Sequence, residues 1–184
     1  MRFISAAILT IAFGTASATT IDFEDQIDGG YLSSVESGGF DFVTDLGGDS
    51  LLVATGGVIG GDYSLAWCVS CNLIMSESNG AVFSLGSFDT YSLATSLGTF
   101  VLTGYRTDGS SVSTTFTGTG SPQTISLDND WTGLTSVVFD PQYYSDLGHV
   151  IDNIEVSVVP VPATAWLFGS ALAGLGWIKR KHAV

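Results

Sequence analysis

The feature that most limits the fold of this chain is the spacing of short strand-like runs between residues 19 and 159. Roughly eleven such runs are separated by Gly, Asp, Asn and Ser, the residues that favour turns. No window of ten or more residues in this region has the 3.6-residue period of an amphipathic helix. The pattern predicts an all-β domain, an antiparallel β-sandwich of the jelly-roll kind.

The hydrophobic share of 45% indicates an ordered domain and excludes a disordered chain. The best-defined hairpin joins residues 99–106 to 111–117 across Asp108-Gly109, because glycine accepts the positive φ of a tight turn. The expected strands occupy residues 20–24, 40–44, 51–54, 64–68, 81–85, 88–94, 99–106, 111–117, 123–127, 134–140 and 149–158.

Residues 1–18 are typical of a secretory signal peptide. Arg2 gives the positive start, residues 3–13 are apolar, and Ala16-Ser17-Ala18 provides the small residues that signal peptidase accepts. We expect cleavage between Ala18 and Thr19, export of the product, and a mature domain that covers residues 19–159.

The C-terminal residues 160–184 predict a membrane segment. The prolines at Pro160 and Pro162 end the preceding strand, and residues 163–178 carry no charge. Sixteen helical residues span roughly 24 Å, which local thinning and the snorkelling of Lys179, Arg180 and Lys181 extend across a bilayer. The basic end is expected to stay cytoplasmic.

This end of the chain resembles a known sorting signal. Val159-Pro160-Val161-Pro162-Ala163, the following apolar segment and the basic end look like the PEP-CTERM signal, in its VPLPA variant. Val161 stands where the namesake motif has glutamate. The resemblance implies handling by an exosortase in a Gram-negative bacterium, with transit through the inner membrane to the cell surface or extracellular matrix.

Charge is distributed unevenly along the chain. All 18 acidic residues lie between Arg2 and Lys179, and Arg106 is the one base in that stretch. So acidic a surface repels phosphate backbones, which excludes nucleic acid as a partner.

The body resembles the galactose-binding-like jelly rolls of carbohydrate-binding modules. The resemblance lies in the opening Ile21-Asp22-Phe23-Glu24 and the closing run 150–156, which contains Asp152-Asn153-Ile154. It implies binding of extracellular polysaccharide and a structural calcium ion held by Glu24 and Asp152, with Asp22 or Asp25 and backbone carbonyls as further ligands.

Asp152 is also informative without that resemblance. Two-residue alternation places it on one face of a strand with Val150, Ile154 and Val156, where an aspartate is costly to bury unless it is paired. A salt bridge to Arg106, a calcium ion, and solvation at the strand entrance are the three alternatives.

The two cysteines, Cys68 and Cys71, form a CxxC motif. In an exported protein this spacing predicts a local disulfide, since zinc would need two further ligands and His149 is the one histidine of the body.

Sequence motifs of catalysis are missing: there is no G-x-S-x-G elbow, and a Ser-His-Asp triad would depend on His149. We expect no catalytic residues and a non-catalytic surface or matrix protein, with Tyr143 and Tyr144 facing a glycan. The alternatives are a structural or adhesive domain without a small ligand, and a hydrolase that acts on polysaccharide through paired carboxylates.

Overall fold

The computed structural model describes residues 17–27, 29–55, 63–68, 70–92, 98–142 and 148–158. Residues 17–158 form one compact unit, and the described ranges contain thirteen strands and no helix. No helix in these ranges has the length and apolarity needed to cross a membrane. The expected signal peptide up to Ala16 and the expected sorting signal from Val159 lie outside the described residues.

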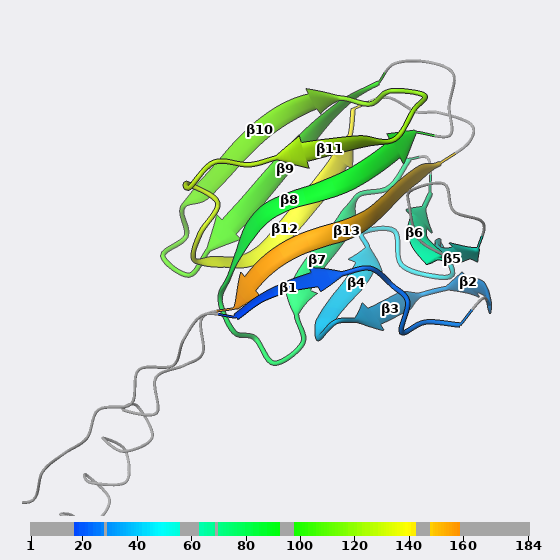
Figure 1. Cartoon of the computed structure of the whole chain (residues 1–184), viewed down its shortest axis with the longest axis horizontal. Helices are drawn as coiled ribbons and strands as arrows, with labels where there is room; N and C mark the ends of the chain where they lie inside the picture. The colour runs from blue at the N-terminus through cyan, green and yellow to red at the C-terminus, as the bar shows by residue number, and fades with distance from the viewer. Residues whose placement is uncertain are drawn as a thin grey trace, which may run out of the picture. The chain divides into compact units, whose positions relative to one another are not determined.

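The strands pair antiparallel throughout and build two layers (Figure 1). The first sheet runs in the order β2 (Gly29–Leu32), β5 (Leu51–Thr55), β6 (Tyr63–Trp67), β13 (His149–Val158), β8 (Phe83–Ser92) and β11 (Gln123–Ser126), with β1 (Ser17–Ile21) beside the second half of β13. The second sheet runs in the order β3 (Ser34–Ser37), β4 (Phe40–Thr44), β7 (Leu73–Glu77), β12 (Leu134–Pro141), β9 (Thr99–Arg106) and β10 (Ser111–Thr117). A single bridge between Leu134 and Phe83 links the two sheets.

The core between the layers is aromatic. Phe88 of the first sheet meets Phe139 of the second edge-to-face, with ring centroids 5.3 Å apart, and Phe40 meets Phe83 in the same way at 5.0 Å. The burial of every second residue in β4 follows from the two-residue alternation of a strand that covers this core on one side.

Gly104 of β9 shows how tightly one end of the core is packed. A Cβ atom at this position would lie 2.8 Å from Leu134 Cδ2 and 3.2 Å from the Trp131 ring. The glycine therefore makes room for the buried indole of Trp131, which anchors the loop between β11 and β12.

The expectation of an all-β antiparallel fold is confirmed. The strands expected over residues 40–44, 99–106, 111–117 and 149–158 agree residue for residue with β4, β9, β10 and β13. The hairpin at Asp108-Gly109 is also confirmed: Gly109 has a φ of 82°, and Asp108 accepts a hydrogen bond from the Ser110 N–H at 2.9 Å.

Three strands, β2, β3 and β7, were not predicted, and the strands expected at 81–85 and 88–94 are one continuous strand, β8. The strand expected over 20–24 begins earlier and ends at Ile21, because Phe23 takes a φ of 58° and turns the chain while its ring enters the core.

Strand β1 begins before the expected cleavage bond. Ser17 and Ala18 pair with Val158 and Ser157 of β13, so both ends of the body lie side by side (Figure 1). Cleavage between Ala18 and Thr19 would remove the first two of the five residue pairs that join β1 to β13.

Candidate functional site

The outer face of the first sheet carries rows of small polar side chains across neighbouring strands. We call this surface, over β1, β13, β8 and β11, the polar face. One complete row consists of Thr20, Glu155, Ser87 and Ser126, which are direct cross-strand partners. Ser87 Oγ donates a hydrogen bond to Glu155 Oε2 at 2.8 Å. The face thus presents hydroxyl and carboxylate groups in a flat array.

Two irregularities shape the polar face at its centre. Between Asp152 and Glu155 the register of β13 against β8 shifts, and Asn153 takes a φ of 47°. A second shift leaves Gly86 without a direct partner, since Ser87 pairs with Glu155 and Leu85 with Val156. Such bulges redirect side chains and backbone groups at functional surfaces.

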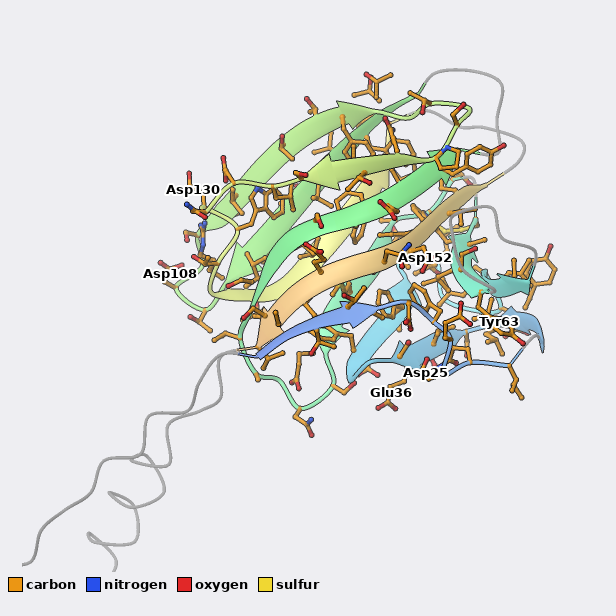
Figure 2. The ribbon with its side chains drawn as sticks, in the orientation of Figure 1. Asp25, Glu36, Tyr63, Asp108, Asp130 and Asp152 are labelled. Carbon is orange, nitrogen blue, oxygen red and sulfur yellow. A yellow bond between two sulfur atoms is a disulfide. The ribbon has the colours of Figure 1, made fainter. Side chains whose placement is uncertain are left out.

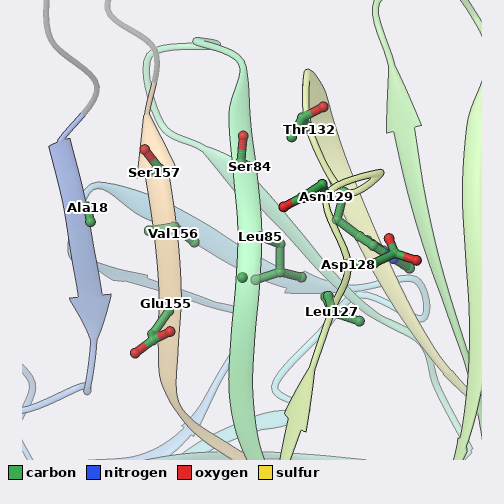
Figure 3. A pocket seen from close by; sticks show the side chains of 12 residues that line it. Ala18, Ser84, Leu85, Leu127, Asp128, Asn129, Thr132, Glu155, Val156 and Ser157 are labelled. Atoms are coloured by element: carbon green, nitrogen blue, oxygen red, sulfur yellow. The ribbon is translucent and has the colours of Figure 1, made fainter.

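A groove of about 250 Å³ lies at the end of the polar face where β1 begins (Figure 3). Its floor is formed by residues 84–86 of β8 and 155–157 of β13, and Ala18 of β1 lies on one side. The loop 127–132 forms the other wall, and the Asn129 side chain projects from that loop towards β8 (Figure 3).

Backbone hydrogen bonds attach the wall loop to β8. The Leu127 N–H donates to the Gly86 carbonyl at 2.8 Å, and the Leu85 N–H donates to the Trp131 carbonyl at 3.0 Å. The bulge at Gly86 therefore frees backbone groups of β8, which bind the loop and hold it beside the groove floor.

Arg106 holds the same loop from the other side. Its Nε donates to the Thr132 carbonyl at 3.0 Å, one terminal nitrogen donates to the Asp130 carbonyl at 2.6 Å, and the other contacts Ser110 Oγ at 3.3 Å. The salt bridge from Arg106 to Asp152 that we considered is wrong. Asp130 and Asp108, next to the guanidinium, lie at one end of the body, well away from Asp152 (Figure 2).

Asp152 is completely buried, so the alternative of solvation at the strand entrance is wrong. Its Oδ1 accepts a hydrogen bond from the Asn153 N–H at 2.8 Å, and Oδ2 has no partner among the described residues. The pKa of Asp152 is raised to about 7, chiefly by burial. The negative charges of Asp22, Asp89 and Glu24 also raise it, whereas the hydrogen bond from Asn153 lowers it.

The side chains of β13 do not follow the simple two-residue alternation along the whole strand. Val150 packs in a small cluster with Ala66, Leu52 and Tyr91, apart from the main core that contains Ile154 and Val156. Asp152 is the direct cross-strand partner of Asp89. The bulge thus separates Asp152 from Ile154, with which the sequence had placed it on one face.

The carboxylates expected to bind calcium have protein partners. Glu24 Oε1 accepts a hydrogen bond from the Tyr63 N–H at 3.1 Å, and Asp22 Oδ1 accepts one from the Glu24 N–H at 3.3 Å. Among the described residues no three His, Cys, Asp or Glu side chains are placed to hold one metal ion. The unpartnered Oδ2 of Asp152 and the surrounding negative charge fit a cation, whereas a full side-chain ligand set is not assembled.

Asp25 belongs to a different contact. It accepts hydrogen bonds from Ser37 Oγ at 2.6 Å, from the Gly38 N–H at 3.2 Å and from the Gln26 amide at 3.0 Å. Burial pushes its pKa upwards, but these hydrogen bonds together outweigh burial and lower the pKa. Asp25 thus stabilises the turn between β3 and β4.

Cys68 and Cys71 are joined by a disulfide, as predicted. His149 lies in the core: its ring is 4.5 Å from that of Phe100 and 5.4 Å from that of Trp67, measured between centroids. Burial lowers the pKa of His149 to about 4, so the imidazole is neutral at pH 7. This packing makes His149 part of the aromatic core.

The aromatic residues divide between core and surface. Trp67 and Trp131 are buried in the core and cannot stack on a sugar, whereas Tyr105 on β9 is 45% exposed. Tyr143 and Tyr144, the expected ligand-facing pair, lie outside the described residues.

The residues of the groove were not predicted. Asn129 and Asp128 lie in a turn without a recognisable motif, and although alternation places Glu155 opposite the apolar face of its strand, its position beside Gly86 depends on pairing between distant strands. Asp89 was missed for a similar reason, since its position opposite Asp152 depends on pairing between distant strands. Gly86 offered a signal: a glycine between strand-like runs can mark a bulge within one strand.

Comparison with known proteins gives a fold and no family. No family model matches the sequence, and no match was found among curated proteins. A family 29 carbohydrate binding module mutant complexed with cellulohexaose is similar, with 15% identity, a TM-score of 0.50 and coverage of 77% of this chain and 91% of that chain. The K2 cleaved adhesin domain of Lys-gingipain is similar with 15% identity, a TM-score of 0.50 and coverage of 76% and 97%. The body thus has a β-sandwich fold that also occurs in these two proteins.

Proposed function

We propose that the body is a non-catalytic glycan-binding module of an exported surface protein. The observation that carries this proposal is the polar face with its groove, which offers hydroxyl, amide and carboxylate groups on a rigid sheet. Sugars are recognised by such hydrogen-bonding groups beside apolar surface, and a preformed site avoids the ordering cost of binding.

The negative charge of the chain argues against an acidic glycan as the ligand. Glu155 and Asp128 border the groove, and the one base of the body, Arg106, is engaged with the carbonyls of the wall loop. A polysaccharide with carboxylate or sulfate groups would be repelled. The ligand is therefore a neutral glycan.

The fold likeness supports this proposal. The similar family 29 carbohydrate binding module was complexed with cellulohexaose, a neutral chain of hexoses, and the other similar structure is an adhesin domain. Both names are consistent with a surface-exposed binding module.

Binding to a glycan panel tests the proposal. The full chain, purified in mild detergent, is titrated calorimetrically with cellohexaose, mannohexaose, xylan oligosaccharides and oligogalacturonate. We expect saturable binding to at least one neutral glycan and none to oligogalacturonate. Binding to oligogalacturonate alone, or to no glycan in the panel, contradicts the proposal.

Export and sorting are part of the same proposal. The signal peptide at residues 1–18, the motif Val159–Ala163 and the basic end from Lys179 support export and handling by an exosortase. In this arrangement the glycan-binding body reaches the outer surface or the matrix, where polysaccharide is present.

Structural calcium at Asp152 and Glu24 is a further proposal. Calcium prefers oxygen ligands, and it would neutralise the group formed by Asp152, Asp22, Glu24 and Asp89. We expect chelator to lower the melting temperature of the wild type and to have no effect on Asp152→Asn. The control Asp49→Asn, in an exposed turn, should respond as the wild type does. A wild type that is insensitive to chelator contradicts the calcium site.

A further inference from the structure

Gly86 is an unusual residue for its position. It lies inside β8, a strand of 10 residues, at the bulge opposite Glu155. Glycine weakens the interior of a strand because it has no side chain to pack and loses much conformational freedom on folding. A glycine at this position therefore calls for an explanation in its backbone conformation, its packing or its function.

Neither the backbone nor the packing of the protein requires glycine there. The φ of Gly86 is outside the left-handed region, so a side chain would cause no backbone strain. A Cβ atom would have Glu155 O, at 3.6 Å, as its nearest neighbour, which is an ordinary contact. Gly104 differs, because its Cβ would meet Leu134 at 2.8 Å.

The space that Gly86 leaves open belongs to the groove. Gly86 lies in the groove floor between Leu85 and the β13 residue Glu155. Its carbonyl is bound by the Leu127 N–H, so the wall loop and the floor are held together at this point. Any larger side chain at position 86 would occupy the volume of the groove itself.

The chemistry around this space suits one sugar ring. Glu155 offers a carboxylate on one side, and Asn129 offers an amide that can both donate and accept on the other. The polar groups on the two sides can each bind a sugar hydroxyl, and the part of the floor at Gly86, which has no side chain, leaves space for the ring.

We propose that the groove over Gly86 binds one residue of a neutral glycan, with Asn129 and Glu155 as hydrogen-bonding partners of its hydroxyls. This inference rests on the proposed glycan-binding function and assigns it to a site. Gly86 is the residue that determines whether a sugar can enter.

The test is Gly86→Val, a change that favours strand structure and fills the groove. The matched control is Gly30→Val, since Gly30 lies in β2 of the same sheet and a Cβ there has no atom within 4 Å. Each variant is made in the full chain, and its melting temperature and its affinity for the neutral glycan bound by the wild type are measured. We expect Gly86→Val to melt no lower than the wild type and to bind at least about tenfold more weakly, and Gly30→Val to bind as the wild type does.

Asn129→Ala and Glu155→Gln provide a second measurement that does not depend on how Gly86→Val folds. Each should weaken glycan binding by about fivefold or more. Unchanged affinity in these two variants and in a folded Gly86→Val overturns the assignment to the groove while the glycan-binding function stands. A wild type that binds no neutral glycan overturns the function instead.

Discussion

The buried histidine gives the protein a stability that depends on pH. His149 has its pKa lowered by burial from 6.5 to about 4, and neither ring nitrogen has a hydrogen-bond partner among the described residues. Below pH 6.5 the unfolded chain takes up a proton that the folded protein refuses. The contribution of His149 is therefore complete above pH 6.5 and is lost as the pH falls towards 4.

We expect the His149→Phe variant to reveal this loss. The difference in unfolding free energy between wild type and variant should fall by about 3 kcal/mol between pH 7 and pH 4, because Phe does not titrate. Urea unfolding of both proteins at several pH values measures this difference. Because the carboxylates titrate in both proteins, their contribution cancels when the two free energies are subtracted. A difference that is constant with pH would show that the imidazole is protonated in the folded protein or is solvated.

At the residue scale the sequence singled out Asp152 and missed the rest of the site. The importance of Asp152 was predictable because two-residue alternation places this aspartate among apolar residues, although the sequence left solvation at the strand entrance open. Its neighbour Asp89 was not, since cross-strand register depends on tertiary packing that a single sequence does not reveal. The roles of Asn129 and Glu155 depend in the same way on a loop and a bulge.

At the element scale one side chain, Arg106, holds the wall loop in addition to the backbone hydrogen bonds to β8. Arg106 donates to the carbonyls of Thr132 and Asp130 and so fixes the loop that closes the groove. In Arg106→Met the aliphatic stem remains and these hydrogen bonds are lost. We expect a destabilisation of about 1–3 kcal/mol and faster amide exchange in the loop.

The Arg106→Lys variant is the control for charge. A lysine keeps the positive charge but lacks the planar guanidinium that donates to both carbonyls. It should therefore restore little of the protection of the loop amides against exchange. Hydrogen exchange of the Trp131 and Thr132 amides measures the effect. Full protection in Arg106→Met would mean that the backbone hydrogen bonds to β8 hold the loop alone.

Two of the well-predicted elements, β9 and β10, have the most regular pattern. β9 and β10 alternate cleanly and are joined by a turn with an unambiguous glycine, Gly109. β8 was divided in two because Gly86 resembles a strand end, whereas it lies at a bulge. β2 and β3 are only 4 residues long and consist largely of small or polar residues, which carry little hydrophobic pattern.

At the scale of the whole molecule the proposed export and sorting depend on the two terminal segments. If residues 160–184 anchor and sort the protein, their deletion should release the body in soluble form into the periplasm or the medium. Cell fractionation with an antibody against the body measures the distribution. The full chain should stay with the membrane fraction in the same strain, and a truncated chain that also stays there contradicts the anchor.

The central position of β13 has a mechanical consequence for an anchored protein. The chain leaves the body at Val158, the end of a strand flanked by β8 on one side and by β6 and β1 on the other. A pull on the C-terminal attachment acts along β13, and because ladder hydrogen bonds run perpendicular to the strands, many of them must slip at once. A pull perpendicular to the strands, which peels off an edge strand such as β10, would open its bonds one after another. If the C-terminal segment anchors the protein and the body binds a polymer, this geometry resists drag on that polymer.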